Sequence, residues 1–163
     1  MTMARGVDSN RLEAVYRERF SDFLRIAFAI TGDEALACDA VQEAFAKALR
    51  SSESFRAESA LDGWIWGILI NVARSLRASK VRGLGQDAID AVVHLDAEQG
   101  ESEFRRWVAA LPERQRLAIF LRYWVDLDYR SIAVALDVEV GTVSATLNAA
   151  HANLRRLLKE VAP

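Results

Sequence analysis

Apolar residues recur along most of the chain at spacings of three and four, which is the period of an amphipathic α-helix. This pattern predicts helices over residues 10–30 and 34–50, each with charged residues on its other face. Gly32 and Asp33 lie between the two segments, where a glycine suits the end of one helix and an aspartate the start of the next. The chain is therefore expected to begin with two consecutive helices.

The following segment changes from polar to almost wholly apolar. Residues 51–59 are polar apart from one aromatic residue, Phe55, and predict a loop, whereas residues 61–73 are apolar at nearly every position. A helix that is apolar all round is buried on several sides. We expect a third helix that begins near Ser59, turns basic from Arg74 onward, and completes a small three-helix bundle.

A second group of helices is predicted in the last third of the chain. A short helix is expected over residues 101–110, and Pro112 suits the first turn of the helix that follows it. Residues 128–147 contain two short apolar stripes separated by the break at Asp137 and Val138. The whole chain is thus expected to be all-α, with two small helical bundles.

The two stripes of residues 128–147 have the spacing of a helix-turn-helix. Asp128 suits the N-cap of the first helix, and Ala133 is small enough for a second helix to cross closely. Small or polar residues face outward from the second helix, which in this motif enters the major groove of DNA. The same pattern also fits an αα-hairpin that binds no ligand.

The two bundles are separated by an acidic segment, residues 83–100, that begins and ends with glycine and predicts a flexible linker. Its acids are Asp87, Asp90, Asp96 and Glu98. The chain as a whole has a formal net charge of −2. Any affinity for nucleic acid must therefore come from local basic patches or from a partner.

Composition narrows the class of protein. Hydrophobic residues make up 52% and charged residues 27%, with 8 glycines and 2 prolines, which favours a helical globular protein. The single cysteine, Cys38, excludes an internal disulfide, and the two histidines lie far apart. No apolar run has the length of a membrane span, so we expect a cytoplasmic protein without membrane insertion. No catalytic constellation, cofactor motif or metal-ligand spacing appears, so an enzyme is not expected.

Two separate blocks of sequence resemble one known family. The block LPERQRLAIFLRYWVDLDYRSIAVALDVEVGTVSATL is similar to the fourth domain of bacterial sigma factors. The blocks TGDEALACDAVQEAFAKAL and WIWGILINVARSLR are similar to their second domain. The short linker points to the extracytoplasmic-function (ECF) group of the sigma-70 family. The resemblance covers roughly residues 10–160 and implies sigma domain 2 over 10–82, a linker over 83–100 and sigma domain 4 over 101–160.

The resemblance implies a docking surface for core RNA polymerase on the second helix. The matching residues are Asp39, Gln42 and Glu43. They share one face of the predicted helix, because they are spaced by three and four residues. An ordinary solvated helix face is the alternative interpretation.

The resemblance also implies contacts with the −10 promoter element near the third helix. Phe55 is a candidate for stacking on an unpaired base, or equally for plugging the bundle, and Trp66 is a candidate for either a DNA-facing or a core position. Asn71 matches a family asparagine near this element, although an amide bonded within the bundle is almost as good an interpretation. Arg74, Arg77 and Lys80, with Arg82, suit phosphate contacts, which position a protein without reading sequence.

Contacts with the −35 element are implied for the helix-turn-helix. The candidates on its exposed positions are Arg130, Thr142, Ser144, Thr146, Asn148, His151 and Arg155. In the third helix, family members often carry basic residues where this chain has Gly67 and Ile70. In the helix-turn-helix, they commonly carry lysine or arginine after Gly-Thr-Val, where this chain has small residues. We therefore expect the second bundle to make few phosphate contacts.

The expected function is that of a sigma factor, which binds core RNA polymerase and directs promoter-specific initiation. Its expected partners are core polymerase and promoter DNA, with an anti-sigma factor as a further candidate. One alternative is a free-standing regulator that binds duplex DNA without polymerase. The other is a helical interaction module that occupies polymerase or another protein and reads no DNA.

Overall fold

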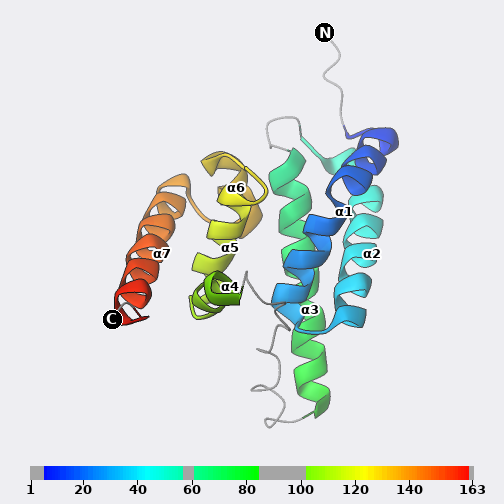
Figure 1. Cartoon of the computed structure of the whole chain (residues 1–163). Coiled ribbons are helices and arrows are strands. Elements are labelled where there is room, and N and C mark those ends of the chain that lie inside the picture. Colours follow the sequence, from blue (N-terminus) through cyan, green and yellow to red (C-terminus); the bar gives the residue numbers. More distant parts are fainter. Residues whose placement is uncertain (1–5, 57–60, 85–101, 162–163) are drawn as a thin grey trace.

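The computed structural model describes residues 6–56, 61–84 and 102–161, and these ranges contain only helices and their connections (Figure 1). The elements are α1 (Ser9–Thr31), α2 (Glu34–Arg50), the short 3-10 helix η1 (Ser52–Ser54), α3 (Leu61–Leu84), α4 (Ser102–Ala109), α5 (Glu113–Tyr123), α6 (Tyr129–Leu136) and α7 (Val140–Val161). The predicted all-α class is confirmed. The predicted start of the third helix near Ser59 and nearly all of the predicted linker lie outside the described residues.

The first bundle contains α1, α2 and α3, which pack against one another in pairs. Gly32 ends α1 in the left-handed conformation with φ of 65°, and the Asp33 side chain caps α2 by accepting a hydrogen bond from the Leu36 amide at 2.9 Å. The predicted stop and start at this point are confirmed. Both helices also end within a residue of their predicted positions.

Aromatic side chains fill the centre of the first bundle. Phe23 of α1 lies between Phe45 of α2 and Trp66 of α3, with ring centroids 5.1 Å and 4.4 Å away. Phe23 and Trp66 are fully buried, and so are Leu69 and Ile70. The apolar run that predicted a helix buried on several sides is therefore the core of this bundle.

The second bundle contains α4 to α7, with α5, α6 and α7 in mutual contact. The predicted helix-turn-helix is confirmed as α6 and α7. The Asp128 side chain caps α6 by accepting from the Ser131 amide at 2.7 Å, and Asp137 ends α6 in the left-handed conformation with φ of 52°. Pro112 was expected in the first turn of α5 but immediately precedes it, where its missing amide costs no helical hydrogen bond.

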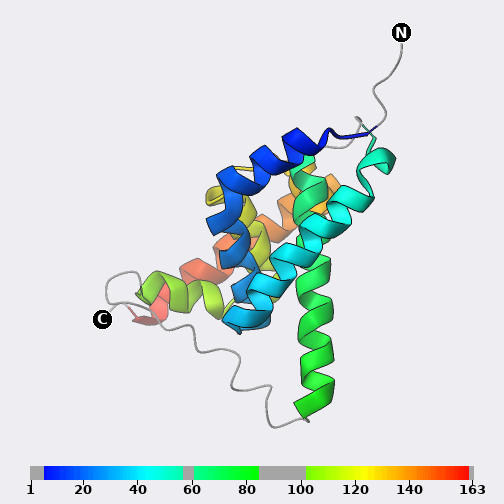
Figure 2. The same ribbon diagram turned by 90° about the vertical axis from the view of Figure 1, so that its right-hand side faces the viewer.

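The two bundles lie against each other. Helix α6 packs on α3, and in Figure 1 α5 and α6 lie between α3 and α7. In Figure 2, turned by 90°, the second bundle lies largely behind the first. Among the described helices, none is by itself long and apolar enough to cross a membrane; α6 and α7 together meet that criterion, but they are bent by 94°. Helix α3 contacts α1 and α2 of the first bundle and α6 of the second.

The left-handed turn at Asp137 gives a test of the helix-turn-helix. Replacing Asp137 with Val should lower the free energy of unfolding by about 1–2 kcal/mol, because a β-branched residue is strained at positive φ. Replacing it with Gly, which adopts this conformation without strain, should not lower stability. Urea unfolding of both variants measures the difference. Equal stability of the Val variant and the wild type would contradict this turn geometry.

Candidate nucleic-acid interface

Three basic residues of α3 are paired with acids within the chain. Arg74 Nε donates to Glu113 Oε1 at 2.8 Å, and both terminal nitrogens of Arg77 donate to Glu113 Oε2 at 3.2 Å. Lys80 Nζ donates to Asp33 Oδ2 at 2.6 Å. All three basic side chains are about one-third exposed. The three candidates for phosphate contact therefore carry intramolecular counterions in this conformation.

Glu113, the first residue of α5, joins the two bundles electrostatically. Its burial alone would raise the pKa of the carboxyl, but the hydrogen bond from Arg74 and the charges of Arg77 and Arg74 outweigh that effect and lower the pKa. Sequence reasoning assigned Glu113 only to a helix start. Its partners lie 39 and 36 positions earlier in the chain, and no local pattern shows such a pairing.

Asp33 has two roles at the other end of the basic stretch. The hydrogen bond from Lys80 and that from the Leu36 amide lower the pKa of its carboxyl. Arg77 also donates to the Ile30 carbonyl oxygen at 3.3 Å. The basic residues of α3 thus hold the end of α1 and the start of α2 in place, in addition to any role on DNA.

The aromatic candidates lie inside the protein in this conformation. Phe55 is 8% exposed and packs against Trp64, with ring centroids 5.1 Å apart. Trp66 is 1% exposed and lies between Phe23 of α1 and Phe120 of α5. Asn71, by contrast, is exposed on α3. Of these candidates, only Asn71 presents its side chain to solvent without a rearrangement.

The three polymerase-docking candidates lie together on an exposed face of α2. Asp39, Gln42 and Glu43 are all exposed, whereas Ala40, Val41 and the other buried residues of α2 face the bundle core. Glu43 accepts a hydrogen bond from Arg50 at 3.2 Å. These three side chains therefore form an exposed polar stripe on α2, and none of the other described elements buries it.

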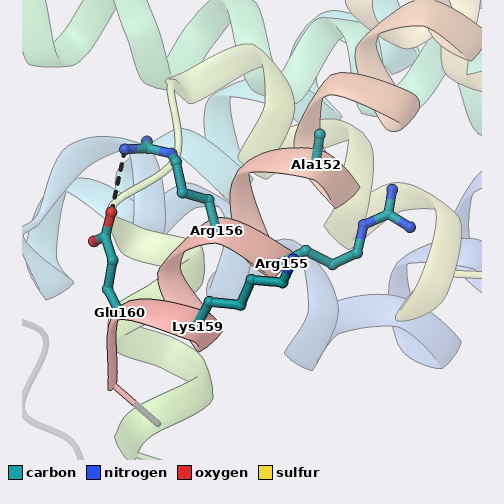
Figure 3. Close-up of a pocket in the computed structure, with 5 residues that line it drawn as sticks. All are labelled: Ala152, Arg155, Arg156, Lys159 and Glu160. Atoms are coloured by element: carbon teal, nitrogen blue, oxygen red, sulfur yellow. Dashed lines mark ion pairs between the residues drawn. The ribbon is translucent and has the colours of Figure 1, made fainter. Parts of the chain in front are cut away.

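The −35 candidates lie on α6 and α7. Arg130, Asn148 and Arg155 are exposed, and Thr142, Ser144, Thr146 and His151 are half-buried. The His151 Nε2 and the Tyr123 hydroxyl lie 2.9 Å apart, at hydrogen-bonding distance. Figure 3 shows the basic end of α7, where Arg156 pairs with Glu160 at 3.6 Å and the Arg155 side chain extends away from that pair.

The link through Glu113 predicts a dependence of stability on pH. A carboxyl whose pKa is lowered by folding contributes stability above its ordinary value, 4.5, and loses it as the pH falls through the lowered value. E113Q should therefore lower the unfolding free energy by about 1 kcal/mol near neutral pH and by almost nothing in strong acid. E18Q, at an exposed glutamate of α1, is the matched control. A loss in E113Q that persists unchanged in acid would contradict the pairing.

Two family models match this chain in the order that the blocks of sequence predicted. Sigma-70 region 2 matches residues 15–83, and Sigma-70, region 4 matches residues 102–154. The ECF RNA polymerase sigma-E factor of Escherichia coli K12 is 34% identical over 127 residues, which cover 67% of this chain and 66% of that protein. The sigma-E factor of Haemophilus influenzae is 39% identical over 127 residues and covers 67% of both. The chain thus spans about two thirds of the length of these relatives.

Two solved structures share the fold. The structure of CnrH in complex with the cytosolic domain of CnrY has a TM-score of 0.69 at 18% identity and covers 95% of this chain and 92% of that one. The sigma factor RpoE, in complex with the anti-sigma factor NepR from Bartonella quintana, has a TM-score of 0.71 at 24% identity and covers 94% and 99%. The two family regions, the sequence relatives and the shared fold together show that this chain belongs to the ECF group of the sigma-70 family.

Proposed function

We propose that this chain is a sigma factor that binds core RNA polymerase and directs it to promoters. The observation that carries the proposal is the presence of both sigma regions, in order, on one all-helical chain. The protein would then act in the cytoplasm with the polymerase and supply no catalytic chemistry of its own. An interaction module that reads no DNA is not favoured, because the relatives are sigma factors.

The division of labour follows the two bundles. Residues 10–82 form the domain for polymerase and the −10 element, and residues 101–160 form the domain for the −35 element, with the linker of residues 83–100 between them. The exposed stripe of α2 supports the assignment of polymerase binding to the first domain, since its polar residues lie outside the bundle core. An anti-sigma factor is a further partner in this proposal, because RpoE is held by one in its solved complex.

The proposed function is tested by run-off transcription with purified core polymerase on fragments of the source genome. The expected result is discrete transcripts that require this protein. Tight, sequence-specific binding of duplex DNA by the protein alone, without such transcripts, would instead indicate a free-standing regulator.

The polymerase face gives a direct mutational test. Replacing both Asp39 and Gln42 with Ala should weaken binding to core polymerase about 10-fold or more, as removal of interface residues commonly does. Helicity by circular dichroism should stay unchanged, because both side chains are exposed. The matched control replaces Glu13 and Arg17, an exposed ion pair on α1. Normal core binding by the α2 variant would remove these residues from the interface.

The −35 domain gives a test on DNA. N148A should change the base preference at one promoter position, because an amide can pair bidentately with adenine, and each such contact contributes about 1–3 kcal/mol of discrimination. R155A should weaken all sequences alike and lower the salt slope of binding by about one unit. Both are measured with holoenzyme on templates randomised in the −35 region. If wild-type holoenzyme shows no base preference there, the second bundle reads no −35 sequence.

A further inference from the structure

The residues that precede α1, residues 6–8, form a short strap across the turn that follows α2 (Figure 2). The Val7 amide donates to the Ser52 carbonyl oxygen at 2.9 Å, and Val7 is buried. Gly6 adopts a φ of 102°, and a Cβ atom there would lie 3.0 Å from the Ser52 carbonyl oxygen and 3.2 Å from Glu53 Cα. The strap therefore lies directly on the backbone of η1, in a conformation that glycine alone adopts without strain.

Helix α1 anchors the other end of the strap. Asp8 is the N-cap of α1, and its side chain accepts a hydrogen bond from the Asn10 amide at 3.3 Å. One turn further along, Leu12 is only 1% exposed, so the start of α1 is packed into the first bundle. The strap therefore ties η1 to a helix whose own position is fixed by the core.

The turn η1 is too short to hold its shape alone. The Ser54 amide donates to the Ser51 carbonyl oxygen at 2.9 Å, and the Phe55 amide donates to the Ser52 carbonyl oxygen at a long 3.4 Å. A single 3-10 turn is marginal by itself, because so few hydrogen bonds scarcely offset the entropy of fixing its dihedrals. The Ser52 carbonyl oxygen thus accepts from both Phe55 and Val7, and the shorter bond comes from the strap.

The shape of η1 determines where Phe55 lies. Phe55 directly follows η1, is 8% exposed, and packs on Trp64 of α3 with ring centroids 5.1 Å apart. Stacking of an aromatic ring on a base depends on the position and tilt of that ring. A segment that is already ordered also loses less conformational entropy when it binds. Whatever holds η1 therefore influences how well Phe55 could receive a base.

We propose that Gly6 and Val7 are positioning residues for the −10 element, which act by bracing η1 and so fixing the place of Phe55. The role at the promoter rests on the proposed sigma function, whereas the brace is a property of the free chain. Neither residue touches nucleic acid in this arrangement. Both act through the Ser52 carbonyl oxygen, which ends η1 at Phe55.

Two substitutions release the strap, and each has a matched control. G6A forces a side chain into the left-handed region and against the backbone of η1, whereas G83A makes the same change on α3, where an added Cβ has no neighbour within 4 Å. V7P removes the N–H group that donates to Ser52. S9P places proline at the first position of α1, where it is tolerated, and after Asp8, whose backbone is already extended.

Amide hydrogen exchange in the free protein tests the brace. Exchange at the Phe55 amide should be at least about tenfold faster in G6A and V7P than in the wild type, because η1 opens more often without its support. It should be unchanged in G83A and S9P. Exchange at Val41, in the buried face of α2, should stay the same in all four variants. The brace is overturned if Phe55 exchanges at the wild-type rate in both G6A and V7P.

Transcription by holoenzyme on promoter templates randomised in the −10 region tests the positioning role. In G6A and V7P, the preference for the favoured base at one −10 position should fall about tenfold, which corresponds to ordering roughly one further residue. Base preference in the −35 region and affinity for core polymerase should stay at their wild-type values. A merely structural role would lower transcription from all templates alike and leave the base preference unchanged, and that result would overturn the proposal.

The outcomes separate this proposal from the sigma function. If the wild type transcribes with a −10 preference that neither G6A nor V7P alters, the positioning role fails and the sigma function stands. If the wild type directs no transcription, the sigma function fails and the role at the promoter fails with it. The exchange rate at Phe55 decides on the brace in either case.

Discussion

The first half of helix α3, residues 61–73, is apolar around most of its circumference, and the packing of both bundles follows from the need to cover it. Two helices of its own bundle, α1 and α2, cover only part of that surface. The remaining part, with Gly63 and Gly67, meets α6 of the second bundle. Burial of apolar surface stabilises a fold by about 25 cal/mol per Å². A long apolar face left in water therefore favours packing against another apolar surface. The second bundle supplies that cover.

Much of the fold is readable from local sequence because its signals are local. Helical periodicity, the Gly32-Asp33 stop and start, and the Asp128 cap each act within a few residues, and each lies where it was expected. Asp137, at the predicted break between the two apolar stripes, adopts the left-handed conformation. The all-round apolar segment also predicted burial on several sides. The family of the chain was readable for a different reason, since two motif blocks occur in the correct order.

The packing of the bundles on each other was not predicted, because it depends on partners far apart in the chain. The pairs of Arg74 and Arg77 with Glu113, and of Lys80 with Asp33, span 36 to 47 positions. A basic run without neighbouring acids therefore suggested a free phosphate-binding face, whereas three of its side chains carry intramolecular counterions. One local signal was present: Gly63 and Gly67, four residues apart on an apolar helix, indicate a close helix crossing. The roles of the candidate residues on polymerase and DNA remain predictions.

The central claim is that the apolar part of α3 holds the two bundles packed against each other in the free chain. It is tested most directly by a distance between spin labels at exposed positions 21 of α1 and 152 of α7, introduced as S21C and A152C with Cys38 replaced by Ala. The account predicts a single, narrowly distributed distance in the free protein and a broad distribution with longer distances when Gly63 is replaced with Ala, whose methyl group would collide with the Ser131 carbonyl oxygen. A broad distribution of distances in the unsubstituted free protein, or an unchanged narrow one in G63A, would contradict it.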